Sequence, residues 1–238
     1  MCTSARVALV TLLCAVFGCS FHARAEECRA VVLDFDDSGS MYQHSIKTPD
    51  GYMGHWKLQL TGHVRALANP EVQELLRLKP TYLAAALWSQ VGAGKIIVPF
   101  MKIKDASDIA LFSSLLTAGV PQGNNGREHG TSHNEAIEIA MGMLAASPCS
   151  ERIIDIVTDE SVPLGTIGLA TMALSLAEKN GITVNILAID TTEGGFVIKS
   201  AESVLKSYDG FVEPALGWEN FIIALERKMI KELTVATR

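Results

Sequence analysis

The sequence contains no apolar run of roughly 20 residues, the length that a transmembrane helix needs. Its longest apolar stretch extends from Val7 to about Cys19, follows an arginine and precedes the small-residue site Ala-Arg-Ala at 23–25. This arrangement is typical of a secretory signal peptide. We therefore expect residues 1–25 to be a signal peptide and residues 26–238 to be the exported chain, located in the periplasm or secreted.

The sequence also lacks an excess of basic residues. It has 20 Lys and Arg against 26 Asp and Glu, for a net charge of −6. Removal of residues 1–25 takes away two arginines and no acid, so the exported chain has 18 basic and 26 acidic residues and a net charge of −8. An acidic chain without a basic cluster argues against nucleic acid or an anionic membrane surface as the partner.

Cysteine is scarce once the signal peptide is set aside. Three of the five cysteines lie within residues 1–25, and Cys28 and Cys149 remain. Two cysteines in an oxidising compartment suffice for one disulfide. A lipoprotein anchored through Cys19 is the alternative to a cleaved and released chain, although Phe17 fits the lipidation pattern poorly.

No internal repeat, low-complexity tract or linker divides the rest of the chain, whose length suits one domain with a substantial core. Apolar strand patterns alternate with helical patterns, which predicts an α/β fold with a mostly parallel sheet covered on both faces. The connection between the strands at 81–88 and 95–103 is short, so we expect these two to be antiparallel neighbours. The other predicted strands are 31–35, 152–159 and 181–190, and the predicted helices are 56–67, 71–78, 105–116, 133–146, 166–180 and 218–233.

A loop rich in oxygen donors follows the first strand. Asp36, Ser38 and Ser40 supply one carboxylate and two hydroxyls, which suit a hard cation such as Mg²⁺. One loop cannot surround an ion, and Thr131 and Asp159 offer further oxygens from other loops at the carboxyl ends of the strands, where ligands bind in such sheets. Ser132 and Glu135 have the spacing of a capping box, which would leave the hydroxyl of Thr131 free just outside the helix.

Three features follow one another along the chain: the DDSGS sequence at a strand end, a Gly-Thr before a helix and a strand ending in Thr-Asp. Together they resemble the metal-ion-dependent adhesion site of von Willebrand factor A domains. Segments such as WKLQLTGHVRAL, KIIVPFMKI and ERKMIKEL extend the resemblance to a poorly characterised exported bacterial subfamily of these domains. The resemblance implies a Rossmann-like, doubly wound sheet of six strands in the order 3-2-1-4-5-6, with one antiparallel edge strand.

The resemblance also implies a binding module rather than an enzyme. Its metal ligands would be Asp36, Ser38, Ser40, Thr131 and Asp159, and the cation would be Mg²⁺, with Mn²⁺ or Ca²⁺ as alternatives. An unidentified partner protein would supply an acidic residue to the open position of the ion, because an ion with few direct carboxylates favours an anionic ligand.

Two acids depart from the family pattern. Glu160 stands where many relatives have glycine, and Asp37 adds a charge nearby; the roles of both stay open.

The implied fold places the first strand parallel to the fourth, so we predict a disulfide between Cys28 and Cys149 at the end opposite the metal. Their two-residue offset relative to the strand ends would have to be absorbed by the turns.

Other interpretations of these residues compete with a metal-dependent binding module. LDFDD resembles the first motif of haloacid-dehalogenase-type phosphatases, with Asp34 as nucleophile and Asp36 as acid or base, but Ser38 is a poor match and no later acidic pair follows a strand. We expect Asp34 instead to be hydrogen-bonded to a neighbouring loop. A scaffold that binds without metal is a third possibility, in which the acidic loop is only a hydrogen-bonded turn.

Two histidines raise a last alternative. His129 and His133 could suggest zinc, but Gly130 and Thr131 interrupt the first helical turn, so that the spacing of a two-histidine metalloprotease helix is not met. We expect these histidines to lie in a solvated loop.

Overall fold

The computed structural model describes residues 26–48, 51–90, 92–121 and 130–235. Six strands form one sheet in the order β5-β4-β1-β6-β7-β8, in which only β5 runs antiparallel to its neighbour. Counted along the chain within this sheet, the order is 3-2-1-4-5-6, so the predicted fold class is confirmed. The strands are β1 (Glu26–Asp36), β4 (Thr81–Trp88), β5 (Lys95–Ile103), β6 (Cys149–Thr158), β7 (Ile182–Asp190) and β8 (Val212–Leu216).

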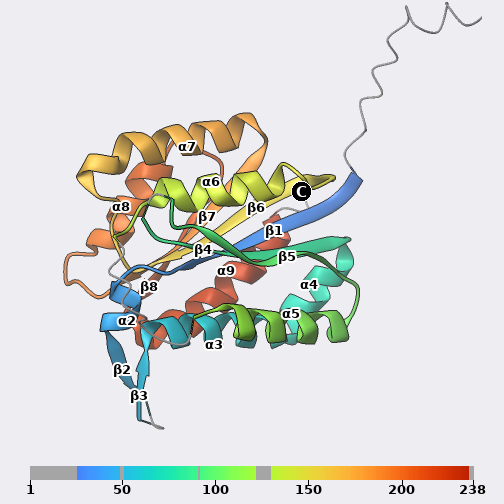
Figure 1. Ribbon diagram of the computed structural model, residues 1–238, viewed down its shortest axis with the longest axis horizontal. Coiled ribbons are helices and arrows are strands. Elements are labelled where there is room, and N and C mark those ends of the chain that lie inside the picture. Colours follow the sequence, from blue (N-terminus) through green and yellow to red (C-terminus); the bar gives the residue numbers. More distant parts are fainter. Residues whose placement is uncertain (1–25, 49–50, 91, 122–129, 236–238) are drawn as a thin grey trace, which may run out of the picture.

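Helices cover both faces of the sheet (Figure 1). The side chains of a strand alternate between its two faces, and in β1 Val31 and Leu33 join one core while Ala30 and Val32 join the other. None of the described helices is long and apolar enough to cross a membrane. One face carries α3 (His55–Ala68), α4 (Pro70–Leu78), α5 (Ala106–Gly119) and α9 (Phe221–Val235), and the other carries α6 (His133–Leu144), α7 (Ile167–Lys179) and α8 (Phe196–Leu205).

Several short elements were not foreseen from the sequence. A short helix α2 (Ser40–Gln43) and a hairpin of β2 (Ser45–Thr48) and β3 (Gly51–Gly54) follow β1 and lie together at one end of the molecule (Figure 1). The helix α8 was also missed. The edge strand β8 was missed because its sequence, VEPAL, has no clear apolar alternation and includes a proline. Proline is tolerated in a sheet chiefly at such an edge. Two single-turn helices complete the fold, η1 (Leu164–Thr166) and η2 (Trp218–Asn220).

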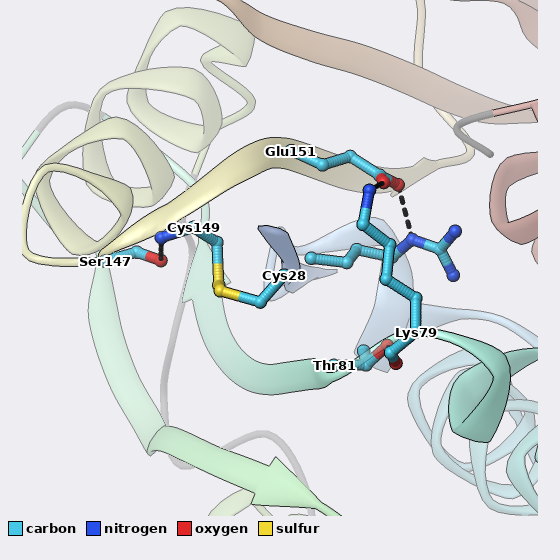
Figure 2. The surroundings of a disulfide bond; sticks show 7 residues. Cys28, Lys79, Thr81, Ser147, Cys149 and Glu151 are labelled. Carbon is cyan, nitrogen blue, oxygen red and sulfur yellow. Dashed lines mark hydrogen bonds and ion pairs between the residues drawn. A yellow bond between two sulfur atoms is a disulfide. The ribbon is translucent and has the colours of Figure 1, made fainter. Parts of the chain in front are cut away.

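Cys28 and Cys149 form the predicted disulfide, with their Cα atoms 4.7 Å apart (Figure 2). The bond joins the amino-terminal parts of β1 and β6, at the end of the sheet opposite the acidic loop. The pairing of these strands shifts between Glu26 and Arg29. Both cysteines lie within strands next to this irregularity, Cys28 in β1 and Cys149 at the start of β6, and not in the turns.

A group of buried charges joins α9 to the middle of the sheet. The ammonium of Lys228 forms ion pairs with Asp155 on β6 and with Glu232 one helical turn later, at 2.6 Å from the Glu232 carboxylate. Burial raises the pKa of Glu232 to about 8, and the charge of Asp155 adds to this effect. Burial alone would lower the pKa of Lys228, but Asp155 and Glu232 outweigh it and raise that pKa.

Candidate metal centre

The site begins where β1 ends, at Asp36. The side-chain amide of Gln59 on α3 accepts a hydrogen bond from the Asp36 backbone N–H and donates one to the Asp36 carbonyl, each at 3.0 Å. The next turn is closed by the backbone N–H of Ser38, which donates to Oδ1 of Asp36 at 2.8 Å. Gln59 therefore fixes the strand end, and the Asp36 side chain itself orders the loop that follows. No sequence pattern pointed to Gln59.

Hydroxyl groups connect this loop to the end of β6. The hydroxyl oxygens of Ser38 and Ser40 lie 3.0 Å apart. Ser40 donates to Oδ1 of Asp159 at 2.8 Å, across 119 residues of sequence. The structure thus brings together four of the five residues singled out in the sequence as cation ligands, from the ends of two neighbouring strands.

Thr131 reaches the same cluster from a third loop. The backbone N–H of the next residue, Ser132, donates to the carbonyl of Ser89 after β4 at 2.8 Å, which holds this loop against the sheet. The Thr131 hydroxyl donates to the carboxylate of Glu160, the neighbour of Asp159. Thr131 therefore joins the cluster through Glu160, a contact that the sequence did not reveal.

The predicted capping box is wrong in its side-chain contacts. Ser132 does occupy the N-cap position of α6, but its hydroxyl donates to Oδ1 of Asn134 at 2.7 Å instead of accepting from the helix. Glu135 accepts from the backbone N–H of Gly94 at 3.1 Å. Neither side chain makes the contact of a capping box, although Thr131 does lie just before the helix, as expected.

His55 is a second residue that the sequence did not indicate. Its Nδ1 lies 3.3 Å from Oδ2 of Asp159, and its ring stacks on Trp218 with ring centroids 4.2 Å apart. His55 is buried at the start of α3, directly after the β2–β3 hairpin. The two oxygens of Asp159 therefore contact different partners, Ser40 and His55.

The cluster is electrostatically unfavourable as it stands. Asp36 is 2% exposed, and its Oδ2 has no hydrogen-bond partner among the described residues. Burial, and then the charges of Asp159 and Glu160, raise the pKa of Asp36 well above its usual value, although hydrogen bonds from Ser38 act in the opposite direction. Within the described ranges, no Lys or Arg forms an ion pair with these three acids. A cation would offset the repulsion.

The donor set fits a hard divalent cation. The side-chain oxygens of the cluster come from carboxylates and hydroxyls, and such oxygens are the ligands that Mg²⁺, Mn²⁺ and Ca²⁺ accept. In the described part of the chain, no three His, Cys, Asp or Glu side chains form a metal-binding group. An ion at this place would therefore depend on the hydroxyls of Ser38, Ser40 and Thr131.

Asp34 does not lie where the phosphatase interpretation requires it. Its side chain is fully buried behind the site, and neither carboxylate oxygen has a hydrogen-bond partner among the described residues, so the predicted hydrogen bond to a loop is wrong. Burial, followed by the charge of Asp155, raises the pKa of Asp34 well above its usual value. A fully buried side chain cannot reach a phosphate, which argues against that interpretation.

The expectation for His133 was wrong, and Asp37, whose role was left open, has a hydrogen-bond partner. His133 is buried at the start of α6, with its ring 5.2 Å from that of Trp88, and does not lie in a solvated loop. Burial lowers its pKa to about 4. His129 lies outside the described residues. Asp37 is buried as well, and its carboxylate accepts a hydrogen bond from the hydroxyl of Tyr42.

The comparisons with known proteins agree with this fold. Residues 28–237 match the family model described as a protein of unknown function (DUF1194). No curated protein matches the chain in sequence.

Solved structures resemble the chain at low sequence identity. One is an aerotolerance-related membrane protein from Bacteroides fragilis NCTC 9343, with a TM-score of 0.56 at 15% identity over 85% of this chain and 99% of that one. Another is proximal thread matrix protein 1 from the mussel byssus with a zinc-occupied MIDAS motif, which has a TM-score of 0.55 at 15% identity. That match covers 87% of this chain and 46% of the mussel chain. At these identities the likeness concerns the fold. The chain belongs to the DUF1194 family of proteins of unknown function, and its fold is that of a von Willebrand factor A domain.

Proposed function

We propose that residues 26–238 form an exported binding module that holds a divalent cation through Asp36, Ser38, Ser40, Thr131 and Asp159. The cation would bind an acidic side chain of a partner protein and so make the interaction metal-dependent. Mg²⁺ is the proposed ion, because neutral hydroxyls and few carboxylates suit a small hard cation that keeps some of its waters. Mn²⁺ and Ca²⁺ accept the same oxygens and are the alternatives.

The unpartnered oxygen of Asp36 is the observation that carries this proposal. A buried carboxylate normally has a hydrogen-bond or ionic partner, because an unpaired buried charge is costly. Oδ1 of Asp36 is used by the backbone of Ser38, and Oδ2 has no partner among the described residues. The hydroxyls of Ser38 and Ser40 lie in the same loop, so an ion beside Oδ2 would find neutral oxygens close by.

The export proposal rests on the predicted signal peptide at residues 1–25 and is supported by the disulfide. Disulfides persist mainly in oxidising compartments such as the periplasm and the extracellular space. Cys28 lies close to the proposed cleavage point, and its bond to Cys149 would tie the new amino terminus to the sheet. Protein sequencing of the exported chain would test this proposal, with Glu26 as the expected first residue.

Calorimetric titration of Mg²⁺ and Mn²⁺ into the metal-stripped protein tests the cation site. We expect about one ion per chain in the wild type and none in Asp36→Asn, which keeps the shape of the side chain but removes the charge. Asp37→Asn is the matched control, because it removes the neighbouring carboxylate that pairs with Tyr42. It should still bind one ion per chain.

Circular dichroism would establish that each variant is folded. A folded wild type that binds neither ion would overturn the proposed site and leave a scaffold that binds its partner without metal. Loss of binding in both Asn variants would mean that general negative charge, and not the position of Asp36, attracts the ion.

A further inference from the structure

Glu160 is fixed in the site by its own backbone. Its N–H donates to the hydroxyl of Thr158 at 3.1 Å, and that hydroxyl lies 3.2 Å from the Glu160 carbonyl. The backbone of Glu160 also interacts with the buried ring of His133 on α6. Contacts from β6 and from α6 therefore hold this residue, which is not a freely moving surface acid.

The side chain of Glu160 turns toward the third loop of the site. Its carboxylate accepts a hydrogen bond from the Thr131 hydroxyl, in a part-buried contact. A hydroxyl has one proton and two lone pairs, so a hydroxyl that donates to Glu160 keeps its lone pairs for another group. A neutral hydroxyl held in this way can act as a metal ligand, because the outer carboxylate sets the orientation of the ligand oxygen.

Glu160 also adds a negative charge close to other carboxylates, where it is electrostatically unfavourable. Its charge acts on the buried Asp36, and Asp159 adds a further carboxylate. Oδ2 of Asp36 has no hydrogen-bond partner among the described residues and is therefore available to a cation. Glu160 therefore adds a third carboxylate to the loops that carry Asp36 and Asp159, although these three acids do not form a metal-binding group by themselves.

We propose that Glu160 is a positioning residue that orients the Thr131 hydroxyl toward the cation and shifts the site toward tight cation binding and weak binding of an external carboxylate. This inference rests on the proposed function and adds a specificity to it. More negative charge near the ion raises its affinity for the site, while it reduces the attraction that the ion exerts on a further anion. A partner would therefore need contacts beyond a single acidic side chain.

The test compares Glu160→Gln and Glu160→Ala with the wild type and with Asp37→Asn. Gln keeps an oxygen that can accept from Thr131 but removes the charge, and Ala removes both. Calorimetric titration of Mn²⁺ gives the cation affinity. Acetate added to the Mn²⁺-loaded protein serves as the carboxylate probe, and water-proton relaxation reports how readily it displaces water from the ion.

We expect Glu160→Ala to weaken Mn²⁺ binding by about 10-fold or more, as is common when an outer-shell partner is removed. Glu160→Gln should fall between Ala and the wild type. Both variants should lose bound water at lower acetate concentrations than the wild type, whereas Asp37→Asn should behave like the wild type in this respect.

The possible failures are distinguishable. A wild type that binds no cation would end the proposed function and this inference with it. Cation binding in the wild type with unchanged Mn²⁺ affinity and acetate response in both Glu160 variants would overturn this inference alone. Weaker Mn²⁺ binding without a change in the acetate response would overturn the claim about external carboxylates, and equal effects in Asp37→Asn would overturn the specific role of Glu160.

Discussion

The imidazole of His55 lies 3.3 Å from the carboxylate of Asp159 and stacks on the indole of Trp218. His55 comes from the helix that follows the β2–β3 hairpin, and Asp159 follows the end of β6. The contact spans 104 residues of sequence and fixes the orientation of one proposed metal ligand. Since Ser40 holds the other oxygen of Asp159, the carboxylate is held from two sides.

Replacement of His55 by Phe is expected to weaken cation binding by about 10-fold, a usual effect of losing an outer partner of a metal ligand. The Phe ring can keep the stacking on Trp218, so the melting temperature of the metal-free protein should change little. Calorimetric titration and thermal unfolding in the presence of a chelator would measure the two effects. A fall in melting temperature with unchanged cation affinity would assign His55 a purely structural role.

Gln59→Ala should destabilise the protein by about 2 kcal/mol or more, because it leaves two buried backbone groups of Asp36 without partners. Urea unfolding of the metal-free protein would measure the change. Gln73→Ala is the matched control, since Gln73 makes one part-buried hydrogen bond, to the Leu67 carbonyl at 3.2 Å. Its cost should be at most about 1 kcal/mol. Equal costs in the two variants would contradict the importance given to Gln59.

Reduction of the Cys28–Cys149 bond should lower the free energy of unfolding by about 4 kcal/mol, because the bond closes a loop across 121 residues and so restricts the unfolded chain. Urea unfolding with and without reductant would measure this difference, and intact mass after alkylation would count the thiols released. A Cys28→Ala, Cys149→Ala double variant should be insensitive to the reductant. Two free thiols in the unreduced protein would show that the bond does not form.

The contribution of Glu232 to the stability of the metal-free protein should fall as the pH rises from about 4.5 to about 8. Burial raises the pKa of Glu232 from 4.5 to about 8, so over this range the folded chain keeps a proton that the unfolded chain releases. At this residue the folded state binds more protons than the unfolded state, so this contribution to stability declines with rising pH. Urea unfolding at several pH values would measure this slope.

Glu232→Gln isolates this contribution, because the amide does not titrate in this range. The variant should show a shallower decline than the wild type. The raised pKa values of Asp34 and Asp36 act in the same direction, and the lowered pKa values of His63 and His133 act in the opposite one. All four residues are present in both proteins, so the difference between the two slopes reports Glu232. Parallel slopes would mean that Glu232 is ionised in the folded protein throughout the range.

The fold could largely be predicted from the sequence. The strands and helices with strong periodicity were found, since a buried strand needs a continuous or alternating apolar pattern and a helix needs an apolar stripe. The resemblance to von Willebrand factor A domains supplied the strand order, which the structure confirms. Of the elements that were missed, β8 and the β2–β3 hairpin are short or weakly patterned, whereas α8 is an amphipathic helix that its periodicity could have revealed.

The sequence by itself determined which residues follow the ends of β1 and β6 and precede α6, and therefore which oxygens could meet at one edge of the sheet. Only the tertiary structure decided which side chains hold them there. Gln59 holds Asp36 across 23 residues, and Glu160 holds Thr131 across 29. Local patterns specify secondary structure through the periodicity of apolar residues, but they contain no record of which distant polar groups will meet. Those contacts arise when the helices pack against the sheet and buried polar groups must find partners there.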